Sequence, residues 1–436
     1  MPDKHKSCSE APKITINVVT LGCPKNTVDS EKIMGRLPAA KFNIIHNSDK
    51  SSQIVLINTC GFINDAKQES IDTILQFVEA KKNNKVFVTG CLAQRYKNEL
   101  ISEIPGIDGV FGLFETNELI KHITGCLYDD GGNRILTTPQ HYAYLKISEG
   151  CDRTCSFCAI PLIRGSNVSF PVEKILDEAE MLAGKGVKEL IVIAQDTTYY
   201  GLDLYKKRKL ALLLEKLSEI KRFEWIRLHY AFPAGFPDDV LEVMTDKDHI
   251  CKYLDIPLQH ISDGLLASMR RNIDKKGTIA LIKKIRHKVP GIALRTAFIV
   301  GYPGETNAQF EELYEFIAEQ KFERMGVFTF SKEEGTAASE LKHQLSSKIK
   351  QERYNKLMEL QQQISFSFNQ AMIGKNVKVI IDRREGDFYV GRTEYDSPEI
   401  DNEVLIPITN NELRPGNFYQ VRITEADDYD LYATVL

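Results

Sequence analysis

Short apolar runs alternate with amphipathic helical patterns along the first part of the 436-residue chain. The apolar runs are ITINVVT (14–20), QIVLINT (53–59) and KVFVTG (85–90), and a polar stretch with helical spacing follows each. A strand that is followed by a crossover helix pairs in parallel with the next strand. The pattern therefore predicts an α/β domain with a parallel sheet over residues 13–128.

The same alternation resumes in the middle of the chain. The expected strands are YLKIS (144–148), ELIVIA (189–194), WIRLHY (225–230), YLDIPL (253–258), ALRTAFIV (293–300) and MGVFTF (325–330). Six consecutive strand–helix units over residues 142–345 predict a curled parallel sheet, a partial (βα)6 barrel. A flat, doubly wound sheet is the alternative, and either fold binds ligands at the carboxyl ends of its strands.

The remaining segments differ in character from these two blocks. A stretch rich in Gly, Asn, Thr and Pro (129–141) is typical of a linker, and the first dozen residues are typical of a loose tail. Residues 346–372 carry leucines at helical spacing, which predicts a connecting helix. Short runs rich in Val, Ile and Tyr over 373–436, beginning with a hairpin that turns at REGD, predict a small antiparallel β-barrel.

The composition argues against several classes of protein. The formal net charge is −4, so the chain as a whole does not attract nucleic acid or an anionic membrane. It shows neither a signal peptide nor an apolar run of about 18 residues, so we expect a cytoplasmic protein without a membrane partner. Nine cysteines without an export signal favour metal binding or catalysis over a disulfide framework.

Three cysteines crowd into eight residues in the stretch CDRTCSFC (151–158). A structural zinc site normally has four ligands, and bacterial ferredoxin spacing also ends in a fourth Cys. No fourth Cys or His lies nearby in the sequence. The thiolates of Cys151, Cys155 and Cys158 on a four-iron cluster would leave one iron open to a small molecule. The iron that lacks a protein ligand is then the position at which a reacting small molecule would bind.

This CxxxCxxC spacing, with an aromatic residue before the last Cys, resembles the signature of the radical S-adenosylmethionine (SAM) superfamily. In that superfamily the open iron of a 4Fe-4S cluster binds SAM, and an electron from the reduced cluster cleaves SAM to methionine and a 5′-deoxyadenosyl radical. The resemblance implies that residues at the strand ends help to hold SAM. The matching positions are Phe157, Gln195, Asp196, Gly301 and Glu305. For His229 and His260, which also follow strands, structural and catalytic roles are equally open.

Three further cysteines, Cys23, Cys60 and Cys91, lie far apart in the sequence but in equivalent places. Each follows an apolar strand, in VVTLGC, VLINTC and VFVTGC. Because the ends of parallel strands meet at one edge of a sheet, we expect the three thiols to lie close together. The alternative is that each Cys fills a tight turn, but three at equivalent positions favour a second three-thiolate cluster. The remaining cysteines match no pattern, and these are Cys8, Cys126 and Cys251.

The order of parts resembles the methylthiotransferase family, which combines a three-cysteine domain, a radical-SAM barrel and a C-terminal TRAM β-barrel. The motifs that carry the resemblance are LGCPKNTVDSE (21–31), NTCGFINDAKQES (58–70), GCLAQR (90–95), AIPLIRG (159–165), LQHISDGLLASMRR (258–271) and VGYPGE (300–305). The resemblance implies two 4Fe-4S clusters and two uses of SAM, as a methyl donor to sulfur and as a radical source. It also implies an electron donor such as flavodoxin or ferredoxin.

Two branches of this family differ in their substrate. RimO-type enzymes modify the β-carbon of an aspartate on protein twelve of the small ribosomal subunit, whereas MiaB-type enzymes modify an adenosine in tRNA. CPKN after the first glycine, and NTCGFI with AKQES, resemble the RimO type. Residues 373–436 hold seven Lys or Arg against thirteen Asp or Glu, a surplus that would repel phosphate and attract a basic protein. We therefore expect a ribosomal protein as substrate, with tRNA as the alternative.

Three other functions stay open at this point. An iron–sulfur electron carrier would not cleave SAM after reduction. An RNA-binding module would bind RNA tightly and with strong salt dependence. A radical-SAM enzyme whose second cluster only relays electrons would form a product without added sulfur. Neither of the first two accounts for a barrel and two sets of cysteines on one chain.

Overall fold

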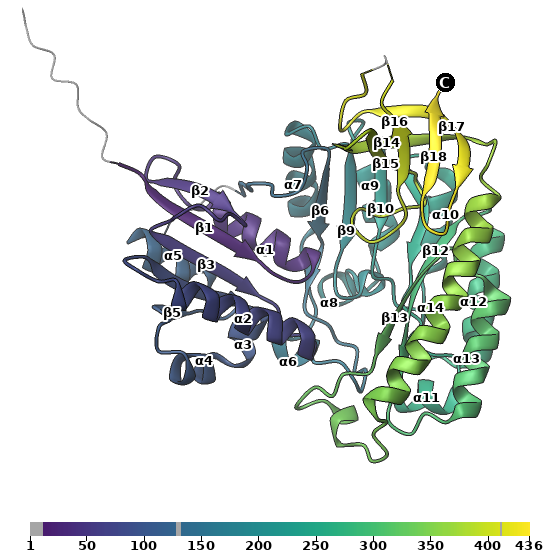
Figure 1. Ribbon diagram of the computed structural model, residues 1–436, viewed down its shortest axis with the longest axis horizontal. Coiled ribbons are helices and arrows are strands. Elements are labelled where there is room, and N and C mark those ends of the chain that lie inside the picture. The colour runs from purple at the N-terminus through teal and green to yellow at the C-terminus, as the bar shows by residue number, and fades with distance from the viewer. Residues whose placement is uncertain (1–11, 128–131, 410–411) are drawn as a thin grey trace, which may run out of the picture. The chain divides into compact units, whose positions relative to one another are not determined.

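The structure, a computed structural model, describes residues 12–127, 132–409 and 412–436. The predicted tail with Cys8, and residues 129–131 of the predicted linker, lie outside these ranges. The internal contacts of the chain divide it into two units, one ending at Thr137 and one beginning at Thr138. Figure 1 shows both units, with helices and strands labelled where there is room.

The N-terminal unit is built on a parallel sheet with the strand order β2-β1-β3-β4-β5. Its strands are β1 (Ile14–Thr20), β2 (Phe42–His46), β3 (Ile54–Thr59), β4 (Lys85–Gly90) and β5 (Gly109–Val110). Its helices are α1 (Pro24–Gly35), α2 (Asn64–Glu79), α3 (Cys91–Arg95), α4 (Lys97–Glu103) and α5 (Thr116–Thr124). Neighbouring strand residues face opposite cores: Leu56 packs with side chains of α1 and α5, and Ile57 packs with those of α2, α3 and α4. Helices therefore cover both faces of the sheet.

The part of the predicted linker that the structure describes is packed against the N-terminal unit. Arg134 is fully buried, and its Nε lies 2.8 Å from Oε2 of Glu31, which is equally buried in α1. The other oxygen of this carboxylate accepts hydrogen bonds from the backbone N–H and the hydroxyl of Thr137. A buried charge is tolerated when it is paired in this way. The described part of the predicted linker is therefore packed as part of the N-terminal unit and does not act only as a connection.

The central sheet of the C-terminal unit has six parallel strands in the order β13-β12-β11-β10-β9-β6. Its strands are β6 (Tyr142–Lys146), β9 (Glu189–Ile193), β10 (Trp225–Leu228), β11 (Ile250–Asp255), β12 (Ala293–Val300) and β13 (Arg324–Thr329). The helices between them are α7 (Val172–Gly184), α9 (Leu210–Ser218), α10 (Asp238–Asp246), α12 (Lys275–Lys288) and α13 (Asn307–Gln320). A doubly wound sheet would reverse its strand order at one point, whereas here each strand neighbours the next. The predicted partial barrel is confirmed (Figure 1).

Several short elements lie in the loops of this unit. They are β7 (Ser148–Glu149), α6 (Ile160–Arg164), β8 (Val168–Ser169), η1 (Thr197–Tyr199), α8 (Leu202–Tyr205), α11 (Asp263–Ser268) and η2 (Ala337–Glu340). β7 and β8 pair as an antiparallel ribbon of two residues each. The ribbon brackets the stretch that carries the three crowded cysteines.

Helix α14 (Ser347–Gln370) follows the central sheet and leads to the C-terminal strands (Figure 1). Its buried residues, among them Leu357, Leu360 and Ile364, recur at the spacing of one helix face. It is therefore an amphipathic helix packed along one side. No helix within the described ranges is long and apolar enough to span a membrane.

The C-terminal strands close into a barrel in the order β14-β15-β16-β18-β17. They are β14 (Asn376–Glu385), β15 (Phe388–Arg392), β16 (Val404–Pro407), β17 (Phe418–Ala426) and β18 (Leu431–Val435). The prediction of an antiparallel barrel needs one correction, because β16 and β18 pair in parallel. β17 lies between them in sequence and pairs in antiparallel fashion with both β14 and β18. β18 therefore closes the barrel against β16 and runs in the same direction as that strand.

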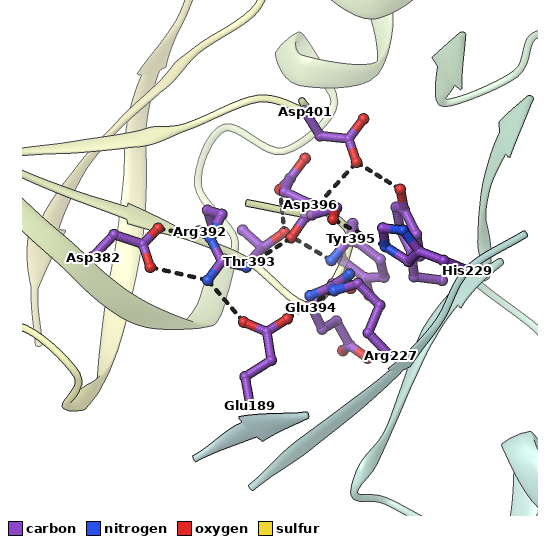
Figure 2. A network of polar contacts seen from close by, with 12 residues as sticks. Glu189, Arg227, His229, Asp382, Arg392, Thr393, Glu394, Tyr395, Asp396 and Asp401 are labelled. Atoms are coloured by element: carbon purple, nitrogen blue, oxygen red, sulfur yellow. Dashed lines mark hydrogen bonds and ion pairs between the residues drawn. The ribbon is translucent and has the colours of Figure 1, made fainter. Parts of the chain in front are cut away.

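Buried charges join this small barrel to the central sheet (Figure 2). Glu189 of β9 lies between two arginines, Arg227 of β10 (Nε–Oε1 2.8 Å) and Arg392 of β15 (Nη2–Oε2 2.7 Å). Arg392 also pairs with Asp382 of β14 (Nε–Oδ2 2.6 Å). Glu189, Arg227 and Arg392 are almost completely buried, so each depends on its partners for the interactions that water would otherwise supply.

The loop of residues 393–401 continues the network toward other strands (Figure 2). Asp396 accepts a hydrogen bond from Nε of Arg324 in β13 (2.8 Å), and Asp401 accepts one from the hydroxyl of Tyr253 in β11 (2.7 Å). His229, which follows β10, shares a hydrogen bond with Ser397 (3.0 Å). One loop of the small barrel thus contacts three strands of the central sheet through polar groups.

Candidate functional site

The three crowded cysteines lie on the loop between β7 and α6, beside a cavity of about 350 Å³. Cys151, Cys155 and Cys158 all line this cavity, and each is partly exposed. The other lining residues include Arg153 within the loop and Thr336 next to η2. Three thiols that border one space are the arrangement that the sequence predicts for a cluster with one open iron.

Two ion pairs hold the start of the loop. Glu149 of β7 lies 2.7 Å from Nζ of Lys146 and 2.8 Å from Nη1 of Arg164, measured to its two carboxylate oxygens. Burial alone would raise the pKa of Glu149, but the two cations outweigh it and lower the pKa to about 2. The backbone N–H of Cys151 then donates to the carbonyl of Gly165 (3.0 Å). The first cysteine is therefore fixed by both charge pairing and backbone hydrogen bonding.

The middle of the loop is tied to the core of the unit. The hydroxyl of Ser156 lies 2.9 Å from that of the buried Tyr302, and its backbone bonds to Met269 and Ala338. Phe157 packs against the hydrophobic cluster that contains Tyr302 and Met269. These contacts anchor the loop between its second and third cysteines, so that the thiols keep a fixed spacing.

The thiols of Cys151 and Cys158 are not ionised by their protein surroundings alone. Burial raises the pKa of Cys151 to about 11 and that of Cys158 to about 12. Arg271 donates a hydrogen bond from Nη1 to Sγ of Cys155 (3.3 Å). Iron cations supply the positive charge that turns such thiols into thiolate ligands, so this donor set fits a cluster.

A single metal ion fits these side chains less well. Across residues 12–127, 132–409 and 412–436, no three His, Cys, Asp or Glu side chains are gathered closely enough to hold one ion. A cluster of four irons needs its thiolates spread over several metal atoms.

The predicted SAM contacts after β9 are placed near the cysteine loop through Arg153. Gln195 is half-buried, and Asp196 is buried. Asp196 accepts hydrogen bonds from Nε of Arg153 (2.7 Å) and from the backbone N–H of Thr198 (2.9 Å). Its carboxylate is therefore already engaged in positioning an arginine of the loop.

The predicted contacts in the Gly301–Glu305 turn are also engaged within the fold. Glu305 is buried, accepts a hydrogen bond from the backbone N–H of Gly301 and lies 3.1 Å from Nη1 of Arg353 in α14. A side chain on Gly301 would collide with Lys350 of the same helix. Within the part of the chain that the structure describes, none of the five predicted SAM contacts lines the cysteine cavity directly. Their contact with SAM stays a prediction.

The two histidines whose role the sequence left open both make structural contacts. His229 bonds to Ser397 within the buried network. His260 is buried, and its Nδ1 accepts a hydrogen bond from the backbone N–H of Ser262 (3.0 Å). These contacts favour the structural interpretation for both.

The three dispersed cysteines meet at one edge of the N-terminal sheet. Cys23, Cys60 and Cys91 follow β1, β3 and β4, which are adjacent strands. A Cβ atom on Gly22, the neighbour of Cys23, would lie 2.9 Å from Sγ of Cys60. Sγ of Cys91 lies 3.6 Å from Oδ1 of Asn26, three residues after Cys23. The structure thus brings together residues that the sequence separates.

A polar frame surrounds this second set of thiols. Nδ2 of Asn26 donates to the carbonyls of Leu21 (2.8 Å) and Thr59 (3.1 Å). Nδ2 of Asn58 donates to the carbonyl of Asn26 (2.9 Å), which links the end of β3 to the start of α1. Cys60 and Cys91 are buried, whereas Cys23 is half-buried. The frame fits a second cluster with its more accessible side at Cys23.

The residues that sequence reasoning missed are the partners of Phe232. The guanidinium groups of Arg153 and Arg271 both pack on this ring, with their Cζ atoms 4.1 and 4.2 Å from its centre. Both arginines lie in motifs that carry the family resemblance, but nothing in the sequence places them on one ring.

Of the other cysteines, Cys126 is exposed and Cys251 is buried, and the pKa of Cys251 is raised by burial to about 12.

Family models match three consecutive parts of the chain. They are an uncharacterized protein family, UPF0004, over residues 15–112, the radical SAM superfamily over 145–317 and the TRAM domain over 373–436. The first match covers the second cysteine set, and the second match covers the crowded cysteines.

Curated relatives match over nearly the whole chain. A protein of Christiangramia forsetii named ribosomal protein uS12 methylthiotransferase RimO is 56% identical over 428 residues, which are 97% of this chain and 95% of the relative. A protein of Flavobacterium psychrophilum with the same name is 55% identical over 425 residues, 96% of this chain and 98% of the relative.

Solved structures show the same fold at low sequence identity. The radical S-adenosylmethionine methyltransferase TsrM from Kitasatospora setae, with cobalamin and a [4Fe-4S] cluster bound, has a TM-score of 0.52 at 14% identity and covers 73% of this chain and 75% of its own. The cobalamin-dependent radical enzyme OxsB has a TM-score of 0.51 at 15% identity and covers 81% and 56%. These likenesses concern the arrangement of strands and helices alone.

Proposed function

The chain belongs to the family of ribosomal protein uS12 methylthiotransferases RimO, and on this basis we propose that it adds a methylthio group to the β-carbon of an aspartate in uS12. The observation that carries the proposal is the 56% identity over 428 residues to a relative with that activity in its name. The three thiols around one cavity supply the independent physical support.

Cys151, Cys155 and Cys158 would hold a 4Fe-4S cluster, and SAM would bind at its open iron in the adjacent cavity. When bound, the cluster and SAM supply the one-electron chemistry that an unreactive C–H bond requires. The protein's part is to hold the loop rigid and to keep water away from its inner side. Glu149 fixes the start of the loop, and Phe157 packs behind it in the core.

A second cluster on Cys23, Cys60 and Cys91 is part of the proposal. It rests on the convergence of the three turns around Asn26. When bound, that cluster would supply the sulfur for the transfer, and a further molecule of SAM would supply the methyl group. Cys23 is the half-buried member of the set, so the group would be reached from its side.

Two features support a protein substrate over tRNA. The relatives named above carry uS12 in their names. In addition, the C-terminal barrel has more acidic than basic residues, which disfavours binding of phosphate groups. Three of these acidic side chains are engaged in the buried contact with the central sheet, and they are Asp382, Asp396 and Asp401. The other acidic side chains of the barrel would therefore provide any attraction to a basic protein.

The compartment and the reductant follow from this function. Because its substrate is a ribosomal protein, we propose that the enzyme works in the cytoplasm. We also propose that a small electron carrier such as flavodoxin or ferredoxin reduces its clusters.

An anaerobic assay tests the function. The reconstituted, reduced enzyme is given SAM, a sulfide source and either small ribosomal subunits or bulk tRNA, and mass spectrometry follows the product. We expect a methylthio addition on an aspartate of uS12 and none in reactions without SAM. Addition on a tRNA adenosine would keep the chemistry and overturn the substrate. Intact SAM with no product would favour the electron carrier.

A further inference from the structure

Arg153 lines the cysteine cavity, and its guanidinium group has an unused hydrogen-bond donor. Among the described residues, its side chain makes one hydrogen bond, from Nε to Oδ2 of Asp196 (2.7 Å). Its Nη2 is buried and has no partner. A buried donor without a partner is unfavourable, so such a group in a folded protein points to a ligand or to a role in the reaction.

The orientation of Arg153 is fixed before any ligand arrives. Asp196 is buried and is itself held by the backbone N–H and the hydroxyl of Thr198 (2.9 and 2.6 Å). The guanidinium plane packs on Phe232, with Cζ 4.1 Å from the ring centre, and lies 5.4 Å from that of Tyr199. A donor group that is already ordered loses little entropy when it binds.

The neighbouring Arg271 shows a different use of the same chemistry. It also packs against Phe232, but its Nη1 donates to Sγ of Cys155 (3.3 Å) and its Nη2 to the carbonyl of Pro257 (2.6 Å). Both of its terminal nitrogens are thus directed to the chain. Nη2 of Arg153, by contrast, has no partner among the described residues.

We propose that the terminal nitrogens of Arg153 bind a carboxylate in the cysteine cavity. A guanidinium presents two parallel N–H groups that match the two oxygens of a carboxylate. The inference rests on the proposed function, which brings two carboxylates to this place: that of the substrate aspartate and that of the methionine part of SAM. Asp196 is then a positioning residue that holds Nε of the guanidinium.

The first experiment measures SAM affinity. Arg153→Gln, Arg153→Lys and the control Arg222→Gln, which removes an exposed arginine outside the cavity, are loaded with clusters and compared with the wild type by anaerobic equilibrium dialysis of labelled SAM. If the carboxylate is that of SAM, Arg153→Gln weakens SAM binding roughly 10- to 100-fold. Arg153→Lys keeps the charge but loses the paired geometry, so its loss is intermediate.

The second experiment measures recognition of the substrate. Binding of purified uS12 is compared with that of uS12 whose target aspartate is replaced by asparagine. If the carboxylate is that of the substrate, the wild type and Arg222→Gln prefer the aspartate form roughly 10- to 100-fold, and Arg153→Gln binds both forms equally weakly.

The proposal is overturned if Arg153→Gln matches the wild type in both experiments while its thermal unfolding and its iron and sulfide content equal those of Arg222→Gln. Should Arg153→Gln fail to fold or to load clusters, Arg153→Lys decides, and equality with the wild type in both experiments contradicts the proposal. A wild-type enzyme that never modifies uS12 contradicts the proposed function instead, while the SAM measurement still judges Arg153.

Discussion

Burial of the cysteine loop opposes the ionised form that iron requires. The pKa of Cys151 is about 11 and that of Cys158 is about 12, so both thiols are protonated at neutral pH in the absence of metal. Metal binding must therefore displace protons from a site that has been shaped beforehand. The shaping is done by neighbouring residues, such as Glu149 and Tyr302, which hold the loop without touching the sulfur atoms.

The two sets of cysteines are expected to fail in different ways when they are mutated. Cys155→Ala should lose the first cluster and with it all cleavage of SAM. A cluster with one open iron already depends on only three thiolates, so it cannot spare one of them. Cys60→Ala should retain SAM cleavage but lose methylthiolation. The measurements are iron content, the electron paramagnetic resonance signal of the reduced protein and chromatography of the SAM products.

Cys126→Ala provides the matched control, because Cys126 is exposed and lies in neither set. It should keep the iron content, SAM cleavage and methylthiolation of the wild type. Methylthiolation by the Cys60→Ala enzyme would rule out a second cluster on the N-terminal sheet. Loss of SAM cleavage in that variant would mean that the two sites depend on one another.

At the level of single residues, the sequence predicts chemistry only where it is encoded locally or in a repeated position. Spacing alone identifies Cys151, Cys155 and Cys158, and equivalent strand ends identify the dispersed cysteines. Arg153 lies inside the same motif, yet its partners Asp196 and Phe232 come from the loops after two other strands. Contacts of that kind depend on how the strands are arranged, so no local pattern predicts them.

The turn between β1 and α1 shows how tightly the second cysteine set is packed. Gly22 has a φ of +88°, and a Cβ atom there would lie 2.7 Å from Cβ and 2.9 Å from Sγ of Cys60. We expect Gly22→Ala to displace the turn after β3 and to abolish the second cluster. Iron content and methylthiolation should fall, while SAM cleavage by the first cluster persists.

Gly125→Ala separates the effect of the collision from that of the backbone. Gly125 has a φ of +83°, but apart from its own chain neighbours and helix backbone no atom of the described residues lies within 4 Å of the position of its added Cβ. Its replacement should cost about 1–2 kcal/mol of stability through the left-handed backbone and leave both clusters intact. A Gly22→Ala enzyme with full iron content would contradict the proposed packing of the second set.

At the level of elements, the sequence predicts long periodic segments better than short ones. The six strands of the central sheet and helix α14 follow from apolar periodicity. By contrast, the stretch with helical spacing that follows KVFVTG (85–90) forms two helices, α3 and α4, because the backbone at Tyr96 leaves the helical region (φ −127°, ψ 39°). β5 has only two residues and owes its pairing to β4, so its own sequence carries too little pattern.

On the scale of the whole C-terminal unit, buried ion pairs connect the small barrel to the central sheet, and apolar patterning does not predict them. Arg392 reaches Glu189, and Arg324 reaches Asp396, across sequence separations of 203 and 72 residues. In the sequence these residues look like ordinary surface charges of strands and turns. Only the folded arrangement shows that each is buried against one particular partner, which makes the small barrel part of the structural support of the central sheet.

Asp396→Asn should therefore destabilise the C-terminal unit strongly. The change keeps the shape of the side chain but leaves Arg324, with 4% of its side chain exposed, without its charged partner. Breaking one side of a buried pair costs about 3–5 kcal/mol. The fluorescence of Trp225 follows unfolding in urea, because this single tryptophan packs edge-on against Phe418 of the small barrel at 4.8 Å.

Arg383→Gln is the matched control, since it also breaks ion pairs of the small barrel. Arg383 pairs with Glu385 and Glu403, but 46% of its side chain is exposed. Water and salt screen such pairs, so the loss should be at most about 1 kcal/mol. Equal losses in the two variants would mean that the buried network contributes no more than surface charge, and the small barrel would then be a separable attachment to the central sheet.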